Sequence, residues 1–353
     1  MELVTIPFRP DIPLVAILGY ACLAFVLGLL LTDPFIRFLH KYRIGKQLRS
    51  ETIDGRSAEI FQQYHKKKQG TPTMGGILIW GSILLTILSS RLLSLTGIVK
   101  HSLLQRGQVY LPLFVLVSLG LLGALDDYLN IRGIGKRRGL DFLPKILSLS
   151  LIAGLGALWF FFKLDYNQIY IPFWGPIIVG WWYIPIFIFI ILSTANAVNF
   201  TDGLDGLAGG LLVLAFSAFG VLAYLHNLSA LATFCAVATG AIAAFLWYNV
   251  PPALFIMGDT GSLALGGALG TIALMTDQVF ILPFIGFIFV LEALSVILQL
   301  LSKRFRSGKK IFKAAPLHHH FEALEWGESK VTMRLWIIGA FMAFLGIILG
   351  IVG

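Results

Sequence analysis

Cysteine is nearly absent from this sequence. Only Cys22 and Cys235 occur, and both lie inside long apolar runs, where a cysteine behaves as a small apolar residue. We therefore expect neither a disulfide framework nor a thiolate metal site.

Charge is also scarce. Charged residues make up 13% of the 353 residues and hydrophobic residues 57%, and the mean hydropathy is +0.84. An ordinary soluble domain contains roughly 45–50% apolar residues. This composition excludes a soluble globular protein and indicates an integral membrane protein.

The apolar residues fall into ten runs, most of which reach the ~17–20 residues that a helix needs to cross a bilayer. We expect spans near 13–36, 74–90, 109–125, 143–162, 177–198, 207–225, 229–248, 261–276, 279–302 and 332–352. The predicted fold is all-α and polytopic, with residues 1–353 forming one transmembrane domain. The first span follows no basic segment and no A-x-A cleavage site, so we expect it to remain in the mature protein.

The basic residues are unevenly placed. The sequence has 27 Lys and Arg against 18 Asp and Glu, which by itself would suit nucleic-acid binding. Most of the Lys and Arg, however, follow the first, third and ninth predicted spans. The positive-inside rule places these loops in the cytoplasm and both termini outside. We interpret the basicity as an orientation signal and not as a nucleic-acid patch.

The unusual polar segments all fall in loops on that same predicted side. They are KKKQGTPTMGG (66–76), DDYLN (126–130), NFTDGLDG (199–206), NVPPALFIMGDTGS (249–262) and PLHHHFE (316–322). They bring five aspartates to one face of the membrane, here called the acidic cluster: Asp126, Asp127, Asp202, Asp205 and Asp259.

Unpaired carboxylates repel one another at low dielectric, so a cation is expected within the acidic cluster. Carboxylate oxygens suit Mg²⁺ or Mn²⁺, and Mg²⁺ usually takes one or two carboxylates plus substrate phosphates. Together with Lys68 and Lys145, this pattern predicts phosphoryl or pyrophosphate chemistry, with Asp259 as the candidate metal ligand.

Structural alternatives exist for the aspartates. Asp126 and Asp127 could end a helix and pair with nearby bases, although adjacent side chains diverge by about 100° on a helix and so should have different roles. Asp202 and Asp205 are three residues apart, which would place both on one helical face with Asn199. Either of them could instead cap the following span.

Two glycine-rich segments resemble a phosphate loop. In GSLALGG, Gly267 stands where that loop requires lysine, so we favour close helix packing. GTPTMGG lacks the lysine too and could be a plain turn, although Lys68 and Thr73 could reach a phosphate or a nucleoside.

Three consecutive histidines follow the ninth span. The side chains of His318, His319 and His320 must point in different directions, which argues against one shared metal. They suit either an interfacial polar turn or hydrogen-bond donors to a polar substrate, and we favour the second. Glu292 is the only acid well inside a span, where it could be paired or line a cavity.

Taken together, these segments resemble the phospho-N-acetylmuramoyl-pentapeptide transferase family, in order and across about residues 66–345. The shared segments are GTPTMGG, LGALDDY, NAVNFTDGLDGLAGG, MGDTGSLALGG preceded by Asn249, EALSVILQ and APLHHHFE. The resemblance implies a bacterial inner-membrane enzyme that moves phospho-N-acetylmuramoyl-pentapeptide from uridine diphosphate to undecaprenyl phosphate and releases uridine monophosphate. It also implies ten spans, a cytoplasmic site, Mg²⁺ dependence and a homodimer.

By this resemblance, Asp259 is the Mg²⁺ ligand, Asp126 and Asp127 lie beside the lipid phosphate with Asp126 as the base, and Lys145 lies near the diphosphate. The remaining matches are positions for the nucleoside or for catalysis: Lys68, Thr73, Asn199, Asp202, Asp205, Asn249 and His318, with His319 and His320 completing the histidine run.

The sequence departs from the family in three places. Many relatives have lysine where Asn130 stands, so one cationic contact is either absent or supplied by a neighbour such as Arg132. Ile256 replaces an aromatic residue that could stack on uracil, and Phe255 is adjacent. The leucine of APLHHHFE replaces the usual isoleucine.

Three other functions share some of these features. A sister transferase for N-acetylglucosamine 1-phosphate would share the acids, but HHHFE and EALSVILQ argue against it. An aromatic prenyltransferase would need N-D-x-x-D where this chain has Phe200 after Asn199. A transporter normally places its polar groups near the midplane of two related halves, and neither feature is present here.

Overall fold

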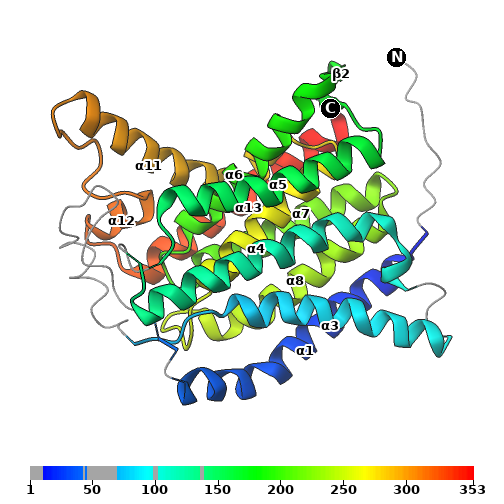
Figure 1. Ribbon diagram of the computed structural model, residues 1–353, viewed down its shortest axis with the longest axis horizontal. Helices are drawn as coiled ribbons and strands as arrows, with labels where there is room; N and C mark the ends of the chain where they lie inside the picture. Colours follow the sequence, from blue (N-terminus) through cyan, green and yellow to red (C-terminus); the bar gives the residue numbers. More distant parts are fainter. Residues whose placement is uncertain (1–10, 43, 46–69, 98–101, 136–138) are drawn as a thin grey trace.

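The computed structural model describes residues 11–42, 44–45, 70–97, 102–135 and 139–353. Its long helices are α1 (Leu14–Lys41), α3 (Gly76–Leu95), α4 (Gly107–Arg132), α5 (Phe142–Lys163), α6 (Tyr183–Thr201), α7 (Leu207–Leu225), α8 (Ser229–Asn249), α9 (Asp259–Met275), α11 (Phe287–Phe305) and α13 (Glu328–Val352). The short helices are η2 (Leu103–Gln105), η3 (Gly180–Trp182), α10 (Leu282–Ile285) and α12 (Leu317–Glu322). Figure 1 shows them as one bundle.

Eight helices in the described residues are long and apolar enough to cross a membrane: α1, α3 to α8, and α13. The all-α, multi-pass membrane fold is therefore confirmed. The predicted total of ten spans and the side on which the termini lie stay predictions. The single span expected at 279–302 was wrong, because this segment forms two helices, α10 and α11, separated at the non-helical Gly286.

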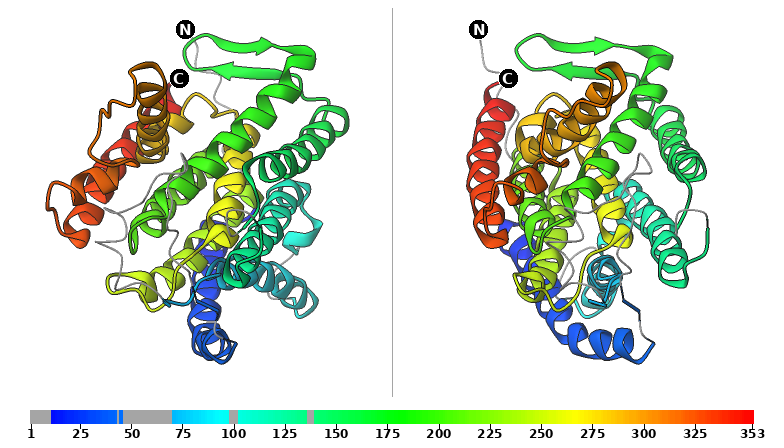
Figure 2. Two further views of the ribbon diagram at one scale, coloured as in Figure 1. Left: turned by 60° about the vertical axis from the view of Figure 1, so that its left-hand side comes forward. Right: turned by 90° about the vertical axis from the view of Figure 1, so that its left-hand side faces the viewer.

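A small hairpin interrupts the helical pattern. Strand β1 (Gln168–Ile171) pairs antiparallel with β2 (Gly175–Ile178), so the span expected to start at residue 177 begins only with α6. The hairpin lies across one end of the bundle (Figure 2). There the Tyr170 hydroxyl and the Phe173 amide donate to the carbonyl of Gly353 at 2.9 and 3.3 Å.

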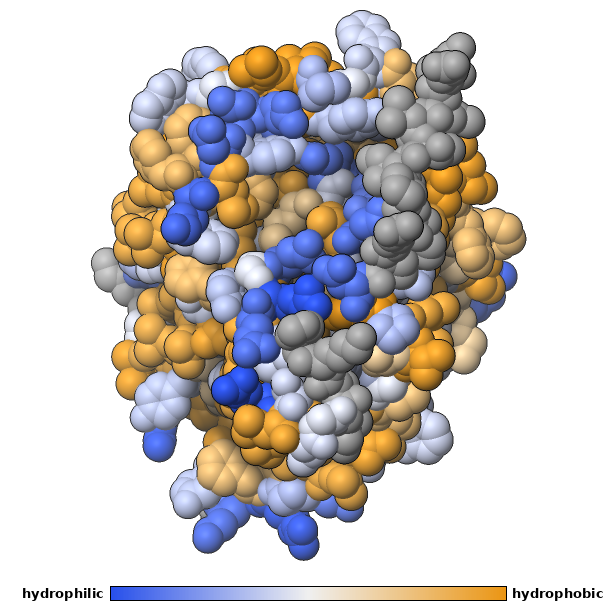
Figure 3. Space-filling view, turned by 90° about the vertical axis from the view of Figure 1, so that its right-hand side faces the viewer, coloured by the Kyte–Doolittle hydropathy of each residue, from blue (hydrophilic) through white to orange (hydrophobic). Residues whose placement is uncertain are grey.

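The surface has the polarity of a membrane-spanning bundle. Seen on the end that carries the hairpin and the C-terminus, hydrophilic side chains gather across the middle, and hydrophobic side chains dominate the flanks (Figure 3). Such flanks suit lipid tails, which offer no hydrogen bonds to polar groups.

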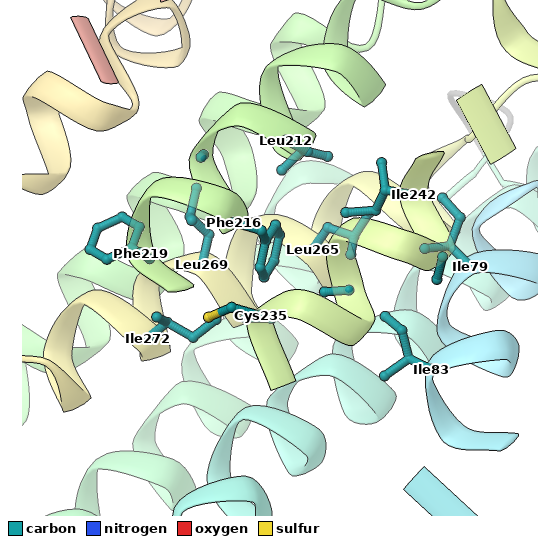
Figure 4. Close-up of a cluster of buried hydrophobic side chains, with 14 of the residues drawn as sticks. Ile79, Ile83, Leu212, Phe216, Phe219, Cys235, Ile242, Leu265, Leu269 and Ile272 are labelled. Atoms are coloured by element: carbon teal, nitrogen blue, oxygen red, sulfur yellow. The ribbon is translucent and has the colours of Figure 1, made fainter. Parts of the chain in front are cut away.

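Helix α9 lies in the interior, packed against α4, α6 and α3, and nearly all of its residues are buried. Leu265 and Leu269 of α9 lie in the same apolar core as Ile79 of α3 and Phe216 of α7 (Figure 4). The segment GSLALGG is part of this helix, so the close-packing interpretation is confirmed and the phosphate-loop alternative is wrong.

Small residues at the crossings let the helix backbones touch. A methyl group on Gly76 of α3 would overlap the backbone of Gly261, and one on Gly123 of α4 would overlap the carbonyl of Asp259. Close approach of this kind supports helix association in a membrane. It also places the end of α4 directly against the start of α9.

We predict that Gly76→Ala destabilises the bundle, because the new methyl group forces α3 away from α9 at a cost of about 1–3 kcal/mol. The matched control is Gly81→Ala on the same helix, where an added methyl group would contact nothing within 4 Å. Thermal unfolding in detergent should show a lower melting temperature for Gly76→Ala alone. Equal melting temperatures for the two variants would contradict the packing account.

A second polar contact ties the hairpin end together. The Tyr166 hydroxyl, just after α5, donates to the carboxylate of Asp277, just after α9. Burial raises the pKa of Asp277 above its ordinary value of 3.8, despite the opposing effects of Tyr166 and His226. Burial, followed by the neighbouring Asp277, also raises the pKa of Tyr166.

A raised carboxyl pKa means that the folded state favours the protonated form of Asp277. The contribution of this protonated carboxyl to folding stability is complete below pH 3.8, and it is lost as the pH rises through the pKa of Asp277 in the folded state. Asp277→Asn lacks this titration. We predict that its melting temperature relative to the native protein is higher at about pH 7.5 than at about pH 4.5. A difference that stays constant or reverses over that range would contradict this assignment.

Candidate functional site

Three helix ends meet at one partly buried cation. The Nζ atom of Lys145, near the start of α5, donates to Oδ2 of Asp126 in α4 at 2.9 Å. It also donates to Oδ2 of Asp259, the first residue of α9. Asp126 further accepts the amide of Leu140 at 2.5 Å. Lys145 thus places one positive charge within the acidic cluster, and the metal ion expected there stays a prediction.

Asp127 faces a different partner. Its Oδ1 accepts the amide of Asp259 at 3.2 Å, and its Oδ2 accepts the amide and the hydroxyl of Thr260 at 3.0 and 2.6 Å. These are free amides of the first turn of α9, whose N-cap Gly258 has no side chain to satisfy them. Asp127 therefore caps α9 from a neighbouring helix. The adjacent aspartates therefore have different partners, and the different roles expected for them stay a prediction.

Asn199, near the end of α6, orients the other side of Asp259. Its Nδ2 donates to Oδ1 of Asp259 at 2.7 Å and lies 2.9 Å from the hydroxyl of Ser262. Both carboxylate oxygens of Asp259 are therefore held, one by an ammonium group and one by an amide. Electrostatic preorganisation of this kind fixes a carboxylate before a substrate arrives.

Asp202 and Asp205 lie in the turn between α6 and α7, so the expectation of a shared helical face was wrong. Gly206, with φ of 76°, ends the turn and is itself the N-cap of α7, so the capping alternative was wrong too. Each carboxylate instead accepts an amide of the 250–258 loop: Asp202 that of Gly258 at 3.2 Å, and Asp205 that of Ala253 at 3.0 Å.

Asn249 fastens the same two loops. Its Oδ1 accepts the amide of Gly206 at 3.0 Å, and its Nδ2 donates to the carbonyl of Phe255 at 2.9 Å. Thr73 is buried, and its hydroxyl lies beside Gly258. These placements bring both residues to the acidic end of the bundle, and their proposed contacts with the nucleoside stay predictions. Lys68 lies outside the described residues.

The three histidines point to three different partners, as predicted. His318 is fully buried against Glu292, whereas His319 Nδ1 lies 2.7 Å from Oε2 of Glu322. His320 Nδ1 accepts the amide of Lys313 at 3.1 Å.

The structure shows the residues that neighbour two of the departures from the family, Ile256 and Asn130. Phe255 is completely buried against Phe245 and Tyr248, so it cannot replace an aromatic residue at position 256. The guanidinium of Arg132 lies 5.5 Å from the centre of the Tyr128 ring on its own helix. Three further residues at the site escaped sequence reasoning: Thr260, Ser262 and Glu328, which accepts the amide of Asp205 at 2.7 Å. The first two are visible inside MGDTGS, whereas nothing local identifies Glu328.

The donor chemistry of the site suits a hard divalent cation, because Asp126 and Asp259 present carboxylate oxygens to one shared position. Within the described ranges, no three His, Cys, Asp or Glu side chains form a metal-binding group. A site with one or two carboxylates that is completed by substrate phosphates is compatible with both observations.

Two family models match the sequence of this chain. Glycosyl transferase family 4 matches residues 109–277, which include Asp126, Lys145 and Asp259. A signature of phospho-N-acetylmuramoyl-pentapeptide-transferase matches residues 68–79. The fold and these family matches thus define a multi-pass membrane transferase.

Curated relatives define the family. The phospho-N-acetylmuramoyl-pentapeptide-transferase of Chloroflexus aurantiacus is 42% identical over 346 residues, covering 94% of this chain and 89% of the relative. That of Bacillus anthracis is 39% identical over 335 residues, covering 94% and 97%. That of Pelagibacter ubique is 40% identical over 340 residues, covering 90% and 88%. The chain belongs to the phospho-N-acetylmuramoyl-pentapeptide-transferase family.

Proposed function

We propose that the chain transfers phospho-N-acetylmuramoyl-pentapeptide from uridine diphosphate to undecaprenyl phosphate, forming the first lipid-linked peptidoglycan precursor and releasing uridine monophosphate. The observation that carries this proposal is Lys145 held between Asp126 and Asp259 at the ends of three helices. A site at helix ends can meet a lipid phosphate at the bilayer surface and a nucleotide sugar from water. The names of the relatives give the transferred group.

In this reaction an oxygen of the lipid phosphate attacks the phosphorus bonded to the sugar. A new P–O bond forms to the lipid, the P–O bond to the uridine monophosphate phosphate breaks, and uridine monophosphate leaves. Asp126 accepts the proton of the lipid phosphate. Lys145 offsets the charge that develops on the transferring group, which is the main task of the protein in phosphoryl transfer. Asp127 keeps the start of α9, and with it Asp259, in place.

We also propose Mg²⁺ as the cofactor, held by Asp259 on α9. When bound, it would neutralise charge on the substrate diphosphate. Lys145 already contacts the same carboxylate, so the lysine and the carboxylate together define where the anionic substrate lies. His318, His319, His320, Asn199, Asp202, Asp205, Thr73 and Asn249 complete the proposed substrate site.

The site is proposed to face the cytoplasm of a bacterial inner membrane, because the positive-inside rule assigns the loops rich in Lys and Arg to the same predicted side as the acidic segments. A homodimer is proposed as the assembly. The partner substrates are a uridine diphosphate sugar peptide and a polyprenyl phosphate.

We predict that purified protein releases uridine monophosphate only when undecaprenyl phosphate, the muramoyl-pentapeptide nucleotide and Mg²⁺ are all present. Chromatographic measurement of uridine monophosphate, with each component omitted in turn, checks this. Uridine diphosphate N-acetylglucosamine, offered in place of the peptide substrate, separates this function from that of the sister transferase. Faster release from that sugar would favour the alternative.

The Asp259→Asn variant tests the role of the Asp259 charge in the same assay. The amide keeps the shape of the side chain but loses the negative charge, so turnover should fall by about 10²-fold or more while the helices stay folded. Near-normal turnover in a well-folded Asp259→Asn protein would refute the assigned role.

A further inference from the structure

A buried carboxylate on α11 contacts the histidine segment. Glu292 is fully buried, and both of its oxygens accept the backbone amide of His318 at 3.2 Å. Its Oε2 also lies 3.1 Å from Nδ1 of the His318 ring. The six-residue α12 has no side-chain N-cap, so Glu292 supplies an acceptor that α12 itself lacks.

The opposite side of the His318 ring contacts the acidic end. A methyl group on Gly203 would overlap Nε2 of His318 and lie 2.8 Å from its Cε1, so the ring fills the space beside this glycine. Gly203 follows Asp202, whose carboxylate accepts the amide of Gly258 next to Asp259. A continuous set of contacts therefore runs from Glu292 through His318 to the acidic cluster.

The His318 ring is unusual for a buried polar group. Its side chain is fully buried, yet neither ring nitrogen has a well-aligned hydrogen-bond partner among the described residues. A buried polar group without such a partner costs about 1–3 kcal/mol, and most native side chains avoid this. A neighbouring element must therefore hold the His318 ring in this position. The Glu292 carboxylate of α11 is placed to do so, because it contacts both the backbone amide and the ring of His318.

The carboxylate needs the histidine in return. An unpaired buried carboxylate is strongly destabilising, whereas one that accepts an amide and faces an imidazole is tolerated. Glu292 sits on a long helix of the bundle, and α12 is a single short segment. The long helix therefore sets the position of His318.

We propose that Glu292 is a positioning residue of the transferase reaction, which fixes the His318 ring against the Gly203 turn beside the acidic cluster. This inference rests on the proposed function and deepens it, because it assigns a task to the one acid inside the apolar part of α11. Glu292 acts through His318 and does not touch the substrate.

The test is a double-mutant cycle on uridine monophosphate release with Glu292→Ala, His318→Ala and the double variant. Glu292→Ala should lower kcat about 10- to 100-fold, the usual range for loss of a supporting residue, while KM for the nucleotide substrate changes little. In the His318→Ala background the same change should have no further effect. Glu292→Gln keeps an oxygen for the His318 amide and should restore most of kcat.

Two results would overturn the proposal. One is a kcat loss in the double variant that equals the product of the two single losses, and the other is a Glu292→Gln protein as slow as Glu292→Ala.

Thermal unfolding tests the contact between His318 and Gly203 independently of the reaction. Gly203→Ala should lower the melting temperature of the native protein and lower it much less in the His318→Ala background. Equal losses in both backgrounds would remove the structural basis. A native protein with no transferase activity but with this thermal coupling would instead refute the proposed function alone.

Discussion

One ammonium group determines how this end of the bundle is built. Lys145 of α5 holds Asp126 of α4 and Asp259 of α9, three residues far apart in the sequence. Two carboxylates this close would repel each other in this partly buried setting, and the positive charge of the lysine between them links the helices instead. Asp127 adds a second tie from α4 to the first turn of α9. The interior position of α9 then fixes the whole cluster.

The loops around this cluster are held by backbone amides. Asp202, Asp205 and Asn249 each bind an amide or carbonyl of the neighbouring loop, so residues that resemble a binding site also shape it. These residues therefore hold the loops in place in addition to their proposed contacts with the substrate. When one of them is mutated, the loss of activity has to be compared with the loss of stability of the same variant.

Much of the fold was predictable from the sequence, because apolar runs of membrane length have few alternatives. The helical fold and the gathering of the five aspartates at one end followed from such runs and from helix ends. The hairpin at 168–178 was missed because its residues are mostly apolar and its second strand, Gly175–Ile178, merges with the apolar run that leads into α6. The break at Gly286 was missed because one glycine in an apolar run rarely ends a helix. The Glu292 to His318 contact joins two elements whose packing no local pattern encodes.

The central claim is that Lys145 is the shared partner of two otherwise repelling carboxylates. The most direct measurement is a thermal-stability cycle between Lys145→Met and Asp259→Asn. Lys145→Met should lower the melting temperature strongly, and adding Asp259→Asn should restore part of it, because one of the two unpaired charges is removed. A double variant less stable than Lys145→Met would show that the two residues act independently and would contradict the account.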